Sequence, residues 1–201
     1  MMKKFILIIL LSPLVAFAQP KGDEISVGSG LSIGPERYYA SGLEFGYTHP
    51  WLNHTAWMLS LSNTHGTISL PRPTTSEIDA SRTTLAFGCK VHEEFASIFS
   101  AGVYLQTGVT AILKHSHNIA PLVNGVGTIV EASSISVSPI LRGGVVLDVA
   151  LTDALSLGLT ADCSALMWYE RSNLHNNPFS SKLFSKERLS CTLGVKMGWH
   201  F

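Results

Sequence analysis

The last residues of the chain, 189–201, read LSCTLGVKMGWHF and alternate between two kinds of side chain. Successive side chains of a β-strand point to opposite faces of the sheet, so this alternation predicts one long amphipathic strand. The apolar face comprises Leu189, Cys191, Leu193, Val195, Met197, Trp199 and Phe201, and the other face comprises Ser190, Thr192, Gly194, Lys196, Gly198 and His200.

The same alternation recurs upstream and predicts seven more strands. The segment 155–169 repeats it most clearly, and six others show it at 24–33, 38–48, 55–64, 81–91, 97–113 and 134–149. Strands of a soluble sandwich usually have about five or six residues, whereas a tilted strand needs about 9 to 11 to cross a bilayer. The lengths therefore favour eight membrane-spanning strands.

The connections between these segments alternate in length. Short connections are expected at 49–54, 92–96 and 150–154, and long ones at 65–80, 114–131 and 170–187, while the connection at 34–37 is an exception in being brief. Short turns at one end and long loops at the other are typical of bacterial outer-membrane barrels, in which the long loops are extracellular. We therefore expect an all-β fold, an eight-stranded antiparallel transmembrane up-and-down barrel.

The two faces of the segments indicate which side meets lipid. A spanning sheet must close on itself because an unpaired backbone amide in hydrocarbon costs several kcal/mol. The apolar faces are expected to point outward, and the polar faces to fill a narrow lumen with paired charges. The alternative is a soluble barrel that binds a ligand inside. The predicted interior polar network comprises Glu44, Arg82, Arg142 and Asp162, with Lys90, Gln106, Asp148 and Lys196 on the same faces.

The N-terminus predicts export. Lys3 and Lys4 precede an apolar stretch at 5–17, and Ala16-Phe17-Ala18 before Gln19 matches a signal-peptidase site. We expect a signal peptide at 1–18 and the barrel domain at 19–201. The 14 basic and 14 acidic residues form no basic block, which argues against nucleic acid as a partner.

The signal peptide, the eight strands and the final strand ending in Phe201 resemble small outer-membrane proteins of the OmpA-transmembrane, OmpX and opacity-protein type. The resemblance implies a location in the cell outer membrane, contact with its lipid and lipopolysaccharide, and delivery to the barrel-assembly machinery through the terminal Phe201. Members of this class differ in task, from adhesion to envelope integrity and lipid modification.

Three motifs are candidates for chemistry. Ser172-Asn173 is similar to part of the motif of lipid A deacylases, with His175 and Glu187 as candidate partners, but Glu170 stands where that family has its histidine. The pair His115 and His117 would suit a metal only with further ligands, so an exposed loop pair is favoured, and we expect no metal and no cofactor. The remaining motif is a cysteine pair: a disulfide between Cys163 and Cys191 is possible, yet unbonded packing against lipid is favoured.

The sequence thus predicts a barrel with a structural or surface-interaction role, in which long loops contact a host or surface ligand. A lipid A acyl-modifying enzyme and a narrow pore remain the alternatives, although an enzyme is the less favoured class.

Overall fold

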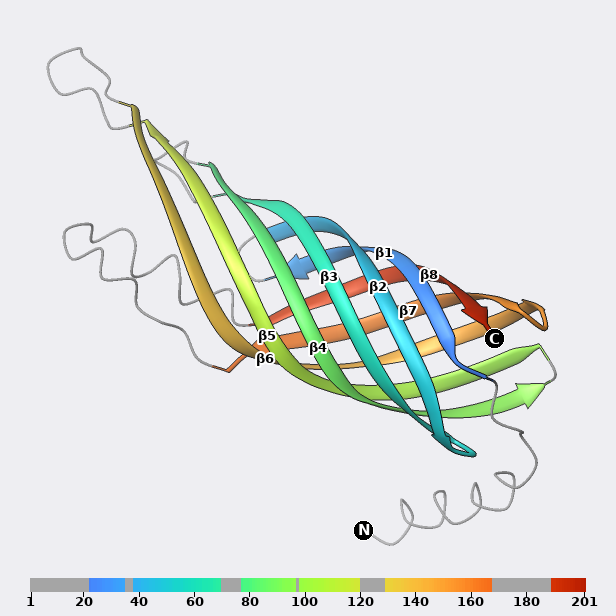
Figure 1. The fold of residues 1–201 in the computed structure, drawn as a ribbon. Coiled ribbons are helices and arrows are strands. Elements are labelled where there is room, and N and C mark those ends of the chain that lie inside the picture. The colour runs from blue at the N-terminus through green and yellow to red at the C-terminus, as the bar shows by residue number, and fades with distance from the viewer. Residues whose placement is uncertain (1–21, 35–37, 70–76, 97, 120–128, 168–188) are drawn as a thin grey trace, which may run out of the picture.

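The computed structural model describes residues 22–34, 38–69, 77–96, 98–119, 129–167 and 189–201. Among these residues, none forms a helix long and apolar enough to cross a membrane. Each strand pairs with the next, and β1 pairs with β8, so the antiparallel sheet closes into a barrel (Figure 1). The strands are β1 (Glu24–Gly34), β2 (Tyr38–Leu52), β3 (Thr55–Ser69), β4 (Glu77–Ala96), β5 (Phe99–Ile119), β6 (Ile129–Thr152), β7 (Leu155–Leu166) and β8 (Leu189–His200).

The barrel is sheared, which tilts its strands. Following paired residues from Glu24 through β2 to β7 leads to Ser190 on β8. The next residue, Cys191, pairs with Ile33, so the circuit returns to β1 about ten residues further on, from position 24 to position 34. Closure with such a stagger requires strands tilted by about 35–45° to the barrel axis.

The strand count and order are confirmed, but several boundaries were wrong. Most of the expected loop 65–80 is strand, because β3 continues to Ser69 and β4 begins at Glu77. The expected loop 114–131 is likewise shortened by β5 and β6, whereas 155–169 was predicted too long because β7 ends at Leu166. Polar and histidine side chains near the ends of β3 to β6 hide this continuation from a test based on apolar alternation. The expected loop 170–187 lies outside the described residues.

The outward and inward faces agree with the alternation. The outward residues Leu43, Phe45, Leu59, Leu85 and Val103, among others, are exposed in the isolated chain. The residues that alternate with them are mostly small or polar and point into the barrel, where Arg82, Gln106, Arg142 and Asp162 are buried. An apolar exterior around a polar interior is the arrangement expected of a barrel that faces lipid.

Strands β3 to β6 rise above the rest of the barrel at the end opposite the termini (Figure 1). The outward positions of β6 are apolar or glycine from Ile135 to Leu151, which at about 3.3 Å per residue and the usual tilt spans about 40 Å along the axis. The apolar band of such barrels is about 25 Å tall. On β3, by contrast, the outward face already turns polar at Asn63 and His65. The upper part of β6 therefore extends beyond the apolar band.

Pro139 lies where this protruding sheet begins. The backbone N–H of Met167 donates to the Pro139 carbonyl at 2.9 Å, and β7 has ended one residue earlier. The nitrogen of Pro139 faces the same side as its carbonyl, so its missing donor falls where the ladder with β7 stops. The proline thus costs the sheet little.

The expectation that Cys163 and Cys191 are unbonded is wrong. The two residues are direct partners in the register of β7 and β8, and a disulfide joins them. Adjacent outward positions on paired strands bring their β-carbons together, which the sequence alone could suggest only as an option. Cys89 is exposed and free on the outer face of β4.

Candidate functional site

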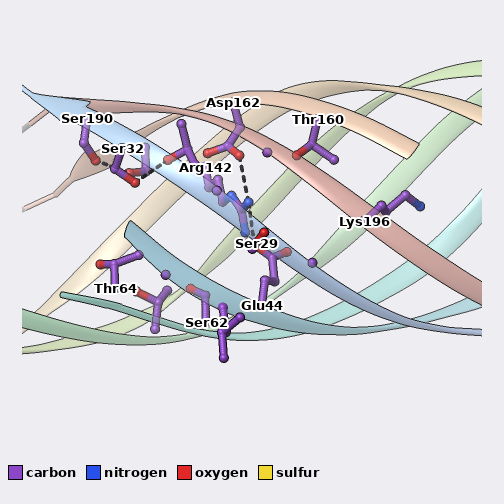
Figure 2. Close-up of a pocket in the computed structure, with 18 of the residues that line it drawn as sticks. Ser29, Ser32, Glu44, Ser62, Thr64, Arg142, Thr160, Asp162, Ser190 and Lys196 are labelled. Atoms are coloured by element: carbon purple, nitrogen blue, oxygen red, sulfur yellow. Dashed lines mark hydrogen bonds and ion pairs between the residues drawn. The ribbon is translucent and has the colours of Figure 1, made fainter. Parts of the chain in front are cut away.

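Arg142 on β6 organises the middle of the lumen. Its Nη2 atom lies 2.7 Å from Glu44 Oε2 on β2 and 2.8 Å from Asp162 Oδ2 on β7 (Figure 2). Because β2 and β6 are diametrically opposite in an eight-stranded barrel, the Arg142–Glu44 pair spans the lumen. One guanidinium neutralises two carboxylates here, and such charge-assisted bonds are among the stronger hydrogen bonds in proteins. Three of the four predicted network residues are therefore brought together.

Tyr104 on β5 completes this cluster, and sequence reasoning missed it. Its hydroxyl donates to Asp162 Oδ2 at 3.1 Å, and the Arg142 guanidinium lies 5.6 Å from the centre of its ring. The ring therefore offers Arg142 a cation–π contact as well as a shared carboxylate. Tyr104 occupies an inward position of the predicted segment 97–113, so the alternation itself carried the signal that this aromatic residue faces the lumen.

A second charge cluster lies closer to the short turns. Lys90 Nζ donates to Asp148 Oδ2 at 3.0 Å, and Lys196 Nζ lies 2.8 Å from Glu24 Oε1 and 3.2 Å from Asp148 Oδ1. Two lysines and two carboxylates balance each other, as buried charges must. Their strands are β4, β6, β8 and β1, so this cluster also ties opposite walls of the barrel together.

Arg82, the fourth predicted network residue, does not join the Arg142 cluster. Its Nη1 atom donates to Ser190 Oγ at 3.0 Å, and Ser190 Oγ lies 2.8 Å from Ser164 Oγ. Arg82 thereby crosses from β4 to the opposite strand β8, towards the outer end of the lumen. Hydroxyl pairs complete this layer, among them Thr84 with Thr110 and Ser32 with Thr192.

Glycines on the inner wall make room for these long side chains. A β-carbon added at Gly144 would lie 2.6 Å from Asp162 Cβ and 2.7 Å from Tyr104 Cζ. One added at Gly158 would lie 2.8 Å from Lys196 Cε. A glycine within a strand often marks such a close approach. Each charge cluster therefore depends on a glycine beside it.

A cavity of about 90 Å³ lies beside the Arg142 cluster, and its lining extends from Lys196 to Ser190 (Figure 2). Its walls are largely serine, threonine and glycine from β1, β2 and β8, and Arg142, Glu44 and Asp162 contribute charges to it. A smaller cavity of about 40 Å³ lies at the turn end, near Lys90, Asp148 and His200. Both are polar and large enough for ordered water. The two charge clusters cross the lumen at different levels beside these cavities. Their side chains therefore connect opposite walls and obstruct the lumen.

Several inward side chains are apolar, which the expectation of polar inner faces did not include. Ile112, Ile140 and Leu166 are buried inside the outer half of the barrel, and Val146 is buried nearer the turns. They occupy inward positions of the strands, so strand alternation alone could have placed them there. Apolar side chains near the charges lower the local dielectric and strengthen the ion pairs.

Other predicted site residues fall elsewhere. Ser172, His175 and Glu187 lie outside the described residues, so the acyl-modifying activity stays a prediction. His115 belongs to β5 and not to a loop, and it is half-buried. Within the described ranges, no group of three or more histidine, cysteine or acidic side chains is placed to hold a metal ion.

A polar contact at the turn end joins the start of the barrel to β2. The Tyr47 hydroxyl donates to Asp23 Oδ2 at 2.7 Å, and His49 Nδ1 lies 2.7 Å from Asp23 Oδ1. The hydrogen bond from Tyr47, followed by that from His49, lowers the pKa of the Asp23 carboxyl below its ordinary value of 3.8. These groups lie on the outer surface and leave the lumen unaffected.

The closed eight-stranded sheet, the apolar exterior and the charged lumen define a small transmembrane β-barrel of the outer-membrane type. No family model matches the chain, and no curated protein sequence matches it. Several solved structures do match it. Ail, the attachment invasion locus protein of Yersinia pestis, is 13% identical with a TM-score of 0.56, covering 90% of this chain and 100% of its own.

Two further structures show the same fold. A major outer membrane protein from Thermus thermophilus is 13% identical with a TM-score of 0.58, covering 90% of this chain and 100% of its own. The outer membrane protein OprG from Pseudomonas aeruginosa is 11% identical with a TM-score of 0.52, covering 92% of this chain and 98% of its own. At these identities the likeness concerns the fold.

Proposed function

We propose that this protein is a surface-interaction barrel of the cell outer membrane, in which the protruding sheet of β3 to β6 binds a macromolecule outside the cell. The observation that carries the proposal is the asymmetry of the rim. Strands β4, β5 and β6 have 20, 21 and 24 residues, whereas β1, β7 and β8 have 11, 12 and 12. A rigid scaffold that holds an extended surface above the membrane suits binding.

The chemistry of the protruding sheet supports a docking role. Ile135 is 74% exposed and Val137 is 54% exposed on its outward face, beyond the level at which β3 turns polar. Above Ile140, the described part of the chain pairs β6 with β5 alone. Exposed apolar patches next to sheet edges commonly mark interaction sites.

The lumen argues against transport as the resting function. Arg142, Tyr104 and the lysine cluster cross it at two levels, and eight strands enclose little more than side chains. A narrow pore remains the second candidate because a polar cavity lies beside each of these clusters. Steady conductance of the unmodified protein in planar bilayers would favour the pore over the surface role.

The test is a binding assay with the full-length mature protein in lipid nanodiscs. Immobilised extracellular-matrix proteins and sulfated glycans form the probe panel; Ail has been crystallised with the heparin analogue sucrose octasulfate, which makes a sulfated glycan a sensible first probe. We expect saturable binding that falls at least tenfold in Ile135→Ser/Val137→Ser. The control is Asp153→Ser, an exposed position in the short turn between β6 and β7 at the other end of the barrel, which should bind normally. Absence of binding to every probe, or equal binding by both variants, would refute the proposal.

A further inference from the structure

The disulfide lies on the lipid-facing wall of the barrel. Cys163 and Cys191 are both exposed in the isolated chain and occupy outward positions of β7 and β8. Their neighbours along the same row of paired residues are Gly143 on β6 and Ile33 on β1. In a membrane, therefore, the sulfur atoms contact hydrocarbon and not the polar lumen.

Apolar pairs flank the disulfide along both strands. On the side towards the short turns lies the pair Ala161 and Leu193, and on the side towards the outer rim lies the pair Ala165 and Leu189. Leu189 and Leu193 are 52% and 66% exposed, as lipid-facing side chains are in an isolated barrel. The disulfide is thus enclosed within the apolar belt.

This location restricts when the bond can form. Thiol–disulfide exchange requires a thiolate, and a thiolate is strongly disfavoured in apolar surroundings. Water-soluble oxidants are also excluded from hydrocarbon. Once β7 and β8 are inserted, the two sulfur atoms can therefore neither be oxidised nor be reduced at a useful rate by soluble reagents.

We infer that Cys163 and Cys191 are oxidised in the periplasm before insertion, by a soluble periplasmic dithiol oxidase. One thiolate attacks the disulfide of the oxidase to give a mixed disulfide, and the second thiolate then displaces the enzyme. The chain gains its disulfide and loses two electrons and two protons, and the oxidase is released as a dithiol. The segment from β7 to β8 then enters the membrane as a covalently closed unit.

The third cysteine, Cys89, competes for oxidation only in the unfolded chain. Cys89 pairs in register with Trp57 on β3 and Leu105 on β5, so the fold offers it no cysteine partner. In the unfolded chain all three cysteines are available to the oxidase. Cys163 and Cys191 are 28 residues apart, whereas Cys89 is much further from either, and shorter loops close at a lower entropic cost. Oxidation before folding therefore favours the native pair.

The first experiment measures accessibility in a Cys89→Ser background. The reduced protein is folded into lipid nanodiscs, where both membrane faces meet solvent, and is treated with oxidised glutathione; free thiols are counted by maleimide mass shift after denaturation. We expect Cys163 and Cys191 to react at least tenfold more slowly than in the urea-unfolded chain. A cysteine-free chain carrying Asp153→Cys in an exposed turn is the control and should react equally fast folded or unfolded. Equal rates for the native pair would overturn the inference.

The second experiment establishes the order of events in cells. Depletion of the barrel-assembly machinery accumulates the unfolded periplasmic form, which is trapped with a membrane-permeable alkylating agent. We expect this form to be already oxidised, and to be reduced in a strain lacking the periplasmic oxidase. Free thiols in the unfolded form, with a disulfide found only in the folded, heat-modifiable form, would show that oxidation follows insertion. Both readouts are independent of any surface ligand.

Discussion

Gly143 and Gly144 are neighbours in β6 that occupy opposite environments. A β-carbon at Gly144 would lie within 2.7 Å of both Asp162 and Tyr104, inside the lumen. A β-carbon at Gly143, on the outer wall, would meet Leu105 Cδ1 at 3.5 Å and the Tyr104 carbonyl oxygen at 3.7 Å, which are ordinary contacts. One residue of sequence thus separates a position that excludes a methyl group from one that accepts it.

This difference gives a matched pair of substitutions. Gly144→Ala should destabilise the barrel by about 1–3 kcal/mol, because Tyr104 and Asp162 must move away from Arg142. Gly143→Ala should change stability by no more than about 0.5 kcal/mol. Urea-induced unfolding in lipid vesicles measures both. Equal effects of the two substitutions would show that the absence of a side chain at Gly144 is not needed to make room for Tyr104 and Asp162.

Removal of the Arg142 guanidinium should lower the unfolding free energy of the barrel. Arg142→Met leaves Asp162, whose side chain is 2% exposed, without its cation, and we expect a loss of about 3–5 kcal/mol in unfolding free energy. Arg142→Met/Glu44→Gln/Asp162→Asn should recover part of that loss, because no unpaired charge remains buried. A triple variant less stable than the single one would contradict this account of the cluster.

The same residues should control ion flow. Unmodified protein is expected to be silent in planar bilayers, because the Arg142–Glu44 pair spans the lumen. Arg142→Ala removes the ion pair that spans the lumen and should produce discrete conductance steps. Arg82→Ala, which removes a separate contact nearer the rim, serves as a comparison and should leave the protein silent. Conductance in Arg82→Ala, but not in Arg142→Ala, would show that the layer containing Arg82 blocks the lumen instead of the Arg142 cluster.

Acidification should act on the contact between Asp23 and Tyr47. Because the pKa of Asp23 is lowered in the folded state, its contribution to stability is present above the ordinary value of 3.8 and is lost as the pH falls through the lower folded pKa. Tyr47→Phe removes the principal hydrogen bond and should raise the pKa of Asp23. An NMR titration of the Asp23 carboxyl carbon measures this shift, with His49→Ala expected to give the same direction and a smaller change.

Loss of the disulfide should weaken the barrel without changing its fold. Cys163→Ser/Cys191→Ser removes a crosslink between residues 28 apart, worth about 3–4 kcal/mol on a chain-entropy basis. The double variant should remain heat-modifiable on a gel but unfold at lower urea concentration. Cys89→Ser, which breaks no crosslink, should behave like the unmodified protein. An unchanged urea midpoint in the double variant would mean that the crosslink adds nothing to stability.

The barrel could be predicted from the sequence because alternation is a local property. Leu193, Val195 and Trp199 face lipid for the same reason that Gly194 and Lys196 face inward, and no distant contact is needed to know it. The interior polar residues followed from the same rule. Their partners did not, since the shear of the barrel decides whether Arg142 meets Glu44, and shear is a property of the closed sheet.

Two features depended on context that alternation does not carry. The strands β3 to β6 continue beyond the point where Asn63 and His65 replace apolar residues, because pairing with neighbouring strands, and not lipid contact, sustains them there. The choice between bonded and unbonded Cys163 and Cys191 depended on register, which places the two residues directly opposite each other. A shift of one residue would have sent one of the two side chains inward.

The seam between β1 and β8 is held like any other pair of strands, and the amide of Phe201 donates to the carbonyl of Asp23 at 3.0 Å. Asp23 and Phe201, which lie at the two ends of the described barrel, are therefore one hydrogen bond apart. A linker of a few residues could join them, and the chain could then be opened at another turn, such as the one between β2 and β3. Circular permutation would then change the order of the strands along the chain without changing the order of the strands around the barrel.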